Sequence, residues 1–296
     1  MSSATETPAA RLAVVAPGLF VALWSTGFIV ARYGTKDAGP LTFLTVRTAV
    51  AATVLFALAR ATRETRLVRA QVRTQWIVGA GIHAMYLGGV FVAIDHGLPS
   101  GVSALIAALH PVVTTVLGRI LLDERLTARR ALGVVLGCAG VVAVVVERGV
   151  SSDDAVGAVA LVAMAIAVVG MSAGTLFQRA TATTVPLLGG TAWQYVSTTV
   201  ILGAGAIASE GWEFTVTTRS VLSLAWAVGI LSLAAILIML WLLQRQAASQ
   251  VSSLFFLTPA LSTLEGAVLF GERLGVLSMV GLVVAIAGVW LTTSSR

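Results

Sequence analysis

Few side chains in this sequence could bind or react, and most of them fall inside long apolar runs. Five polar or aromatic residues lie well inside such runs: Trp24, His83, Tyr86, Trp193 and Gln194. Each polar group there needs a hydrogen-bonding partner or a hydrated cavity, because apolar surroundings cannot solvate it. Aromatic rings can stack on a flat ligand while N–H, O–H and amide groups orient its polar end, so we expect these five residues to line a binding cavity. For His83 the alternative is an ordinary hydrogen bond in a packed core.

Arg47 and Glu265 are charged residues that also lie inside apolar runs. At about 1.5 Å of rise per helical residue, each lies about 9 Å from the outer end of its expected span. Equal depth permits an ion pair, which could serve as a gate or as a site for a ligand carboxylate. Alternatively, both side chains extend toward the nearer headgroup layer and do neither. The sequence leaves these alternatives open.

The sequence lacks the motifs of several common enzyme chemistries. There is no Gly-x-x-x-x-Gly-Lys-[Ser/Thr] loop for nucleotide phosphates, and Lys36 is the only lysine. A hydrolase or acyltransferase would need a nucleophile and a base within hydrogen-bond reach of each other. The single cysteine, Cys138, offers no disulfide framework and no cysteine metal site. We therefore expect no enzyme activity, no cofactor and no metal, with a membrane-embedded enzyme as the alternative from another class.

Composition indicates a membrane protein. Hydrophobic residues make up 57% of the chain and charged residues 11%, with a mean hydropathy of +0.95, whereas a soluble domain carries about 25% charged residues. Apolar runs recur at the length of about 20 residues that crosses a bilayer as a helix. Barrel strands would be about half as long and would alternate polar with apolar residues, so we expect an all-α integral membrane protein. Its ten expected transmembrane helices are 13–31, 41–60, 76–95, 100–122, 129–147, 156–178, 187–208, 221–243, 249–270 and 274–292.

Basic residues predict the orientation, because cytoplasmic loops are enriched in Lys and Arg. With the N-terminus inside, thirteen basic residues fall on the cytoplasmic side and five on the outer side. Five arginines between residues 60 and 73 contribute to the net charge of +6, and their loop position suits anionic lipid rather than nucleic acid. We expect both termini in the cytoplasm, lipid as a partner, no nucleic acid and no cleaved signal peptide.

Two stretches of the sequence are versions of one another. Residues 110–144 align with residues 258–292 without a gap, at a constant offset of 148 (259 − 111). The matched pairs are Pro111 with Pro259, Glu124 with Glu272, Gly133 with Gly281, and Gly140 with Gly288. We expect two five-helix repeats, 1–148 and 149–296, and because five is odd the second enters the membrane inverted. Inverted repeats are typical of secondary transporters, whose substrate sites lie near the bilayer midplane between the halves.

Pro111 and Pro259 fall near the middle of two expected helices, 100–122 and 249–270. A proline inside a helix removes a backbone donor and kinks the helix. The pair could form hinges that open a site to each side in turn, or static kinks that only shape the packing. Glu124-Arg125 and Glu272-Arg273 lie between helices, where we expect each carboxylate to cap the start of the following helix or to pair locally with arginine.

Ten helices in two halves, each with a proline-bearing helix, a Glu-Arg-Leu corner and a glycine-spaced final helix, resemble the EamA-type drug/metabolite transporter superfamily. The resemblance covers nearly the whole chain and looks most like the YddG-type bacterial aromatic amino-acid exporters. It implies a secondary transporter of the bacterial inner membrane that exports small metabolites, with aromatic or bulky apolar amino acids as the expected substrates. A cationic drug or methyl viologen exporter is the alternative.

Two further expectations concern the energy source and the assembly. Glu265 is the only carboxylate well inside an apolar run, and residues 13–31 contain none. We therefore expect transport by alternating access, driven by the gradient of the substrate or at most weakly coupled to protons. The chain is expected to act as a monomer or a weak homodimer.

Overall fold

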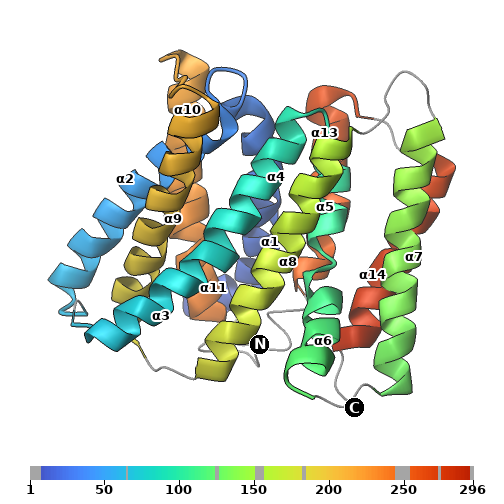
Figure 1. Ribbon diagram of the computed structural model, residues 1–296, viewed down its shortest axis with the longest axis horizontal. Helices are drawn as coiled ribbons and strands as arrows, with labels where there is room; N and C mark the ends of the chain where they lie inside the picture. The colour runs from blue at the N-terminus through green and yellow to red at the C-terminus, as the bar shows by residue number, and fades with distance from the viewer. Residues whose placement is uncertain are drawn as a thin grey trace, which may run out of the picture.

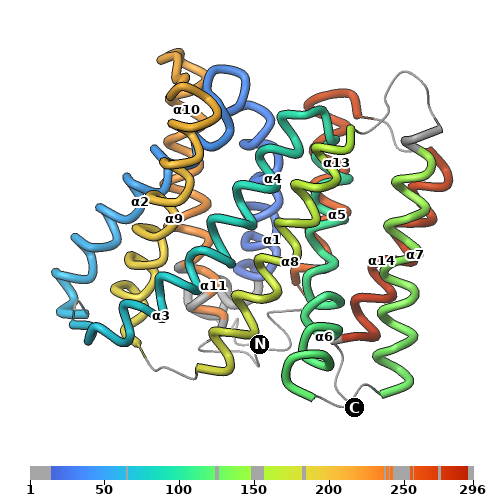
Figure 2. The backbone as a smooth tube through the Cα atoms, viewed as in Figure 1, coloured from blue at the N-terminus to red at the C-terminus, as the bar shows by residue number. Residues whose placement is uncertain are grey.

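The computed structural model describes residues 8–64, 66–123, 127–150, 157–181, 185–243, 254–272 and 275–293, and shows a bundle of helices (Figures 1 and 2). The α-helices of the first half are α1 (Pro8–Gly34), α2 (Pro40–Ala61), α3 (Arg69–Gly79), α4 (Tyr86–Asp95), α5 (Ser100–Ala107), α6 (His110–Leu121) and α7 (Ala128–Val150). Those of the second half are α8 (Ala158–Thr181), α9 (Leu187–Ser209), α10 (Thr218–Trp226), α11 (Ala235–Leu243), α13 (Thr258–Phe270) and α14 (Val276–Thr293). In the described ranges the only strand-like pairing is the bridge between Ala38 and Phe214. The all-helical class is therefore confirmed.

Six helical segments of the described chain are long and apolar enough to cross a membrane. They are Val15–Gly34, Pro40–Ala61, Arg69–Asp95, Ser100–Leu121, Ala128–Glu147 and Ala158–Thr181. Two shorter apolar segments, Thr218–Ala234 and Val276–Thr292, lie where further membrane helices are expected. The count of ten stays a prediction. The third helix starts earlier than expected, at Arg69 rather than residue 76, because its first turns are polar and extend beyond the apolar run.

Helices that are equivalent under the repeat pack against each other. α7 packs on α14 and α2 packs on α9, and α7 and α14 run in opposite directions (Figure 1). Matched glycines allow this approach: a Cβ added to Gly140 would lie 2.4 Å from the carbonyl oxygen of Gly281, and one added to Gly133 would lie 2.7 Å from that of Gly288. Small residues let helix backbones touch in a bilayer, where packing drives helix association. α1 begins and α14 ends at the same end of the bundle (Figure 1).

Carboxylates link each half to a helix start in the other half. Glu210, after α9, accepts hydrogen bonds from the N–H groups of Leu41 and Thr42 at the start of α2, both at 2.8 Å. Glu64, after α2, accepts one from the N–H of Leu188 at the start of α9, at 3.3 Å. The first N–H groups of a helix lack intrahelical acceptors, and the helix dipole favours a negative charge there. The two carboxylates are thus reciprocal caps between the halves.

The corner residue Glu272 also caps a helix, but not the helix that follows it. Its carboxylate accepts from the N–H groups of Ser100 at 3.0 Å and Gly101 at 3.4 Å, at the start of α5. It also pairs with Arg32 at the end of α1. Glu272 thus has a structural role, but the expectation that it caps the following helix or pairs locally was wrong, because its partners belong to the first half. Residues 124–126 and 273–274 lie outside the described ranges.

The third helix of each half leaves regular α-geometry at matching positions. A π-helical segment, η1 (Ala80–Met85), joins α3 to α4, and another, η2 (Ala227–Ala234), joins α10 to α11. Ser197 and Thr198 of α9 donate to the carbonyls of Trp76 at 2.8 Å and Gly79 at 3.3 Å, just before η1. These bonds satisfy backbone oxygens where the helix widens. Such π-turns occur frequently at functional sites.

The fourth helix of each half is interrupted rather than kinked at its proline. α5 ends at Ala107 and α6 begins at His110, while α13 begins at Thr258 directly after the short 3₁₀ turn η3 (Phe255–Leu257). Pro111 and Pro259 therefore lie in the first turn of a helix and not in the middle of one. Proline is tolerated there because the N–H that it lacks would have no helical acceptor. The expectation of two mid-helix kinks was wrong in this respect.

Candidate functional site: a cavity between the two halves

A cavity of about 120 Å³ lies between the two halves. Both halves supply mostly aromatic and aliphatic side chains to its wall. The first half supplies Trp24, Gly27, Phe28, Arg47, Ile82, His83, Tyr86, Leu87, Val90 and Phe91, and the second supplies Met171, Tyr195, Leu231 and Ile236. Both π-helical segments thus border the cavity, η1 through Ile82 and His83 and η2 through Leu231.

A second space of about 30 Å³ adjoins the first. The two spaces share Trp24, Phe28, Tyr86 and Met171 as lining residues. The smaller one reaches both helix interruptions, since Ala108, His110, Phe255 and Thr258 also line it. An apolar cavity of about 150 Å³ in another protein holds one benzene molecule. The larger space is therefore close to the size of one aromatic ring, and a whole aromatic amino acid would also need the smaller space or a movement of its walls.

Three of the five expected site residues line the cavity, namely Trp24, His83 and Tyr86. Gln194 does not line the cavity but contacts a residue that does. Its Oε1 lies 3.0 Å from His83 Nε2, and its Nε2 donates to Gln75 Oε1 at 2.6 Å. Since the amide nitrogen of Gln194 is used by Gln75, its oxygen accepts the hydrogen of His83 Nε2. Both glutamines are buried, so this chain of hydrogen bonds fixes the orientation of the His83 ring.

Trp193 does not line the cavity. Its ring packs edge-on against Phe56 of α2, with the ring centroids 5.5 Å apart. Consecutive residues of a helix point about 100° apart, so the inward position on α9 falls to Tyr195, two residues later. Tyr195 is buried and packs edge-on against His83 at 4.8 Å. A signal for this exchange was present, since Gln194, Ser197 and Thr198 form a polar stripe at helical spacing that is buried together with Tyr195.

Arg47 and Glu265 are not brought together. Arg47 lines the cavity and donates from Nε to the hydroxyl of Ser232 at 3.2 Å. Glu265 instead lies 2.6 Å from the hydroxyl of Ser25 on α1. In the described chain α2 packs on α9, α4 and η2, whereas α13 packs on α5, α1 and η3. The two residues face different helices, and their equal depth and their roles as a gate stay predictions.

His110 and Ser172 stabilise the interruption of the fourth helix. The Nδ1 atom of His110 lies 3.3 Å from the carbonyl oxygen of Ala107, and Ser172 donates to the carbonyl of His110 at 2.9 Å. Ser172 belongs to the sequence Gly170-Met171-Ser172-Ala173-Gly174, which has the spacing of a hydrolase nucleophile motif. That motif requires a sharp turn between a strand and a helix, whereas Ser172 is fully buried inside α8. Its role here is therefore packing and backbone support.

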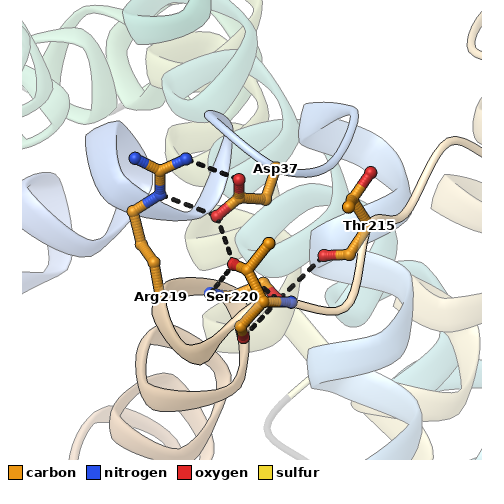
Figure 3. Close-up of polar contacts among 5 residues, drawn as sticks. Asp37, Thr215, Arg219 and Ser220 are labelled. Atoms are coloured by element: carbon orange, nitrogen blue, oxygen red, sulfur yellow. Dashed lines mark hydrogen bonds and ion pairs between the residues drawn. The ribbon is translucent and has the colours of Figure 1, made fainter.

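Polar contacts join the two halves at the upper end of the bundle in Figure 1, which carries residues 34–40 and 209–218 and is called the Asp37 end below. The Asp37 carboxylate accepts from Arg219 Nε at 2.7 Å, from Arg219 Nη2 at 2.5 Å and from the hydroxyl of Thr217 at 2.7 Å (Figure 3). The bond from Arg219, followed by that from Thr217, lowers the pKa of Asp37 to about 2. The N–H of Thr215 also donates to the carbonyl of Asp37 at 2.7 Å. Asp37 precedes α2 and the other residues precede or begin α10, so these bonds join the two halves.

The described residues hold no cluster of three or more His, Cys, Asp or Glu side chains arranged as metal ligands. What the fold and cavity define is a class of protein: a helical membrane bundle of two similar halves around a central cavity is typical of membrane transporters. The chain belongs to the EamA-like transporter family, which matches residues 12–146 and, a second time, residues 158–294. The two matches confirm that the family's unit occurs twice, while the boundary between residues 148 and 149 stays a prediction.

Similar proteins cover nearly all of the chain. Two carry the name "Probable amino-acid metabolite efflux pump": one from Salmonella typhimurium (strain LT2) is 25% identical over 290 residues and one from Escherichia coli (strain K12) is 23% identical over 287, each covering 92% of both chains. An "Uncharacterized transporter" of Archaeoglobus fulgidus is 23% identical over 293 residues, 94% of this chain and 97% of that one. A solved structure, described only as the crystal structure of a protein, matches 96% of both chains with a TM-score of 0.62 and 20% identity. This last likeness supports the fold alone.

Proposed function

We propose that this transporter exports amino acids with aromatic or bulky apolar side chains. The observation that carries the proposal is the cavity between the halves, whose wall is formed mainly by aromatic and aliphatic side chains. Trp24 and Tyr86 border both spaces, so an aromatic side chain between them would contact rings on two sides. Offset or edge-on ring pairs contribute about 0.5–1.5 kcal/mol beyond the area that they bury. The names of the two efflux pumps mention amino-acid metabolites, which supports an amino-acid cargo without indicating its side chain.

The proposed mechanism is alternating access around this cavity. The Asp37 end is closed by bonds between the halves, and access from that side requires these bonds to break. The interruptions before Pro111 and Pro259 border the smaller space, so bending there would widen it toward one end. The backbone there forms tight turns, with Leu109 N–H bonded to Ile106 and Thr258 N–H bonded to Phe255, and their poorer hydrogen-bond geometry makes these two positions the proposed hinges.

The lining favours an amino acid over a cationic drug. A cation exporter needs a buried carboxylate at its site, and the described lining residues include none. Arg47 instead places a positive charge at the cavity, which repels cations such as methyl viologen. Glu265 lies outside the lining, so we propose transport down the gradient of the substrate, with at most weak proton coupling. We place the protein in the bacterial inner membrane with both termini cytoplasmic, and the Asp37 end is then external.

Transport by the purified chain in liposomes tests this function. Phenylalanine, tryptophan, leucine, alanine and methyl viologen would be compared, each with and without a pH gradient. We expect the aromatic amino acids and leucine to move faster than alanine and methyl viologen, and Trp24→Ala and Tyr86→Ala to reduce that flux. Trp212→Ala is the matched control, because Trp212 is 46% exposed on the loop before α10. A preference for methyl viologen would favour the cation exporter, and strong acceleration by a pH gradient would contradict gradient-driven transport.

A further inference from the structure

We infer that Arg47 binds the carboxylate of the substrate, and that the site recognises this negative charge rather than the amino group. The inference deepens the proposed function and rests on it for the identity of the cargo. It concerns a guanidinium on α2 that lines the cavity and is only 5% exposed.

The charge of Arg47 has no counter-charge in its surroundings. None of the fourteen lining residues is acidic, and the described chain contains no ion pair that involves Arg47. Glu265, the acidic residue that the sequence suggested as a partner, instead accepts a hydrogen bond from the hydroxyl of Ser25 on α1. Arginine does not lose its proton in proteins, and a buried charge is costly unless it is paired. A cavity with an unbalanced cation in its wall therefore favours an anionic ligand.

The guanidinium is oriented so that its terminal nitrogens remain free for a ligand. Its Nε donates to the hydroxyl of Ser232 at 3.2 Å, and Ser232 is fully buried on η2. In the described chain this is the one hydrogen bond of Arg47, so its two terminal nitrogens have no partner. Neither of them is fully buried, so both have surface that faces the cavity. Two parallel N–H groups match the two oxygens of a carboxylate, which makes a bidentate contact both strong and directional.

The rest of the cavity suits an apolar group and offers little to an ammonium. Trp24 and Phe91 line the same space, so a carboxylate at Arg47 leaves a ring in aromatic surroundings. An ammonium would need acceptors, and a carboxylate is missing from the described wall. The acceptors that His83, Tyr86 and Tyr195 offer at the wall are neutral, and a neutral acceptor holds an ammonium less strongly than a carboxylate does. Compounds that keep the acid but lack the amine should therefore bind, whereas compounds that keep the amine but lack the acid should not.

Binding of three related compounds tests the inference on the full-length protein in lipid nanodiscs. L-phenylalanine carries both groups, 3-phenylpropanoate only the acid and 2-phenylethylamine only the amine. Affinity would be measured by calorimetry for the native protein and for Arg47→Gln, Arg47→Lys and Ser232→Ala. Arg119→Gln is the control, because Arg119 is a half-exposed arginine paired with Asp123 at the far surface.

In the native protein we expect L-phenylalanine and 3-phenylpropanoate to bind with affinities within about tenfold of each other, and 2-phenylethylamine to bind at least tenfold more weakly than either. Arg47→Gln should weaken binding of both acids by about 10- to 100-fold, as expected for the loss of a charge-assisted bidentate contact. Arg47→Lys should recover part of that loss, and Ser232→Ala should have a smaller effect. Preferential binding of the amine by the native protein, or unchanged acid binding by a folded Arg47→Gln variant, would overturn the inference.

The same data separate this inference from the proposed function. If the protein transports phenylalanine and Arg47→Gln leaves binding of the acids unchanged, the proposed function holds and the role of Arg47 in carboxylate binding is refuted. If 3-phenylpropanoate binds in an Arg47-dependent way but no amino acid is transported, the role of Arg47 in carboxylate binding holds and amino-acid export is refuted. The comparison of the three compounds on the native protein does not depend on whether the variants fold.

Discussion

Removing the carboxylate of Glu272 should open the Asp37 end of the bundle. Glu272 belongs to the second half, and its side chain is 9% exposed. It holds the first N–H groups of α5 through Ser100 and Gly101, and it pairs with Arg32 of α1. Glu272→Ala would leave these groups of the first half without their acceptor, and the loss would fall on the closed arrangement, in which the halves meet.

The size of the effect follows from these contacts. Loss of a side-chain acceptor at a helix start costs about 0.5–2 kcal/mol. The pair with Arg32, whose side chain is 36% exposed, adds only about 0.2–1 kcal/mol because water screens it. The closed arrangement should therefore lose about 1–3 kcal/mol, and since 1.4 kcal/mol is a factor of ten, the open population should rise about 5- to 150-fold.

A single reporter cysteine can measure this population. Cys138 is the only cysteine, so Cys138→Ala gives a cysteine-free background, and Met171→Cys then places one thiol at both spaces of the cavity. A membrane-impermeant maleimide would be added to each side of oriented vesicles in turn. We expect Glu272→Ala to raise the labelling rate from the side of the Asp37 end by about 5- to 150-fold, the population change derived above, and Glu272→Gln to raise it less, because the amide keeps one acceptor.

Glu147→Ala is the matched control. Glu147 accepts from the N–H groups of Leu277 at 3.1 Å and Ser278 at 2.8 Å at the start of α14, so its loss also uncaps a helix. That cap lies within the closely packed pair of α7 and α14, away from the cavity wall. An equal rise in both variants, or no rise in a folded Glu272→Ala protein, would refute the link between Glu272 and closure.

Two further predictions concern stability. Gly140→Ala should lower the melting temperature in detergent, because its Cβ would lie 2.4 Å from the carbonyl oxygen of Gly281 and overpacking costs about 1–3 kcal/mol. Gly18→Ala is the control and should leave the melting temperature unchanged, because nothing lies within 4 Å of its Cβ. Equal effects of the two substitutions would contradict the packing argument. Arg219 lowers the pKa of Asp37 from 3.8 to about 2, so the stabilisation from this pair should be full above about pH 4 and lost as the pH falls toward 2. The difference in melting temperature between the native protein and Asp37→Asn should thus stay constant from about pH 5 to 8 and shrink below about pH 4, and a change within the neutral range would contradict it.

The sequence predicted those features that depend on position along the chain. Apolar runs located the helices, and the offset of 148 paired Gly140 with Gly288 and Pro111 with Pro259. Depth along a helix was also accessible, because rise per residue is nearly constant. Trp24, His83 and Tyr86 were found in this way, as polar or aromatic groups too deep for an interface.

Features that depend on rotation about a helix axis could not be predicted. On α9 the depth of an aromatic ring did not distinguish Trp193 from Tyr195, and only the buried polar stripe of Gln194, Ser197 and Thr198 indicates the inward face. Arg47 and Glu265 were placed at equal depth, but only tertiary packing determines that one faces Ser232 and the other Ser25. The π-helical segments were missed as well, because a widened turn depends on hydrogen bonds from a neighbouring helix.

The reciprocal carboxylates Glu64 and Glu210 have a consequence for how the chain matures. Each completes a helix start that belongs to the other half, so neither half is self-sufficient. While the ribosome has delivered only residues up to the midpoint, α2 still lacks the acceptor for its first turn. The first half is therefore expected to insert without the Glu210 cap on α2, and α2 gains this acceptor only when the second half inserts beside it.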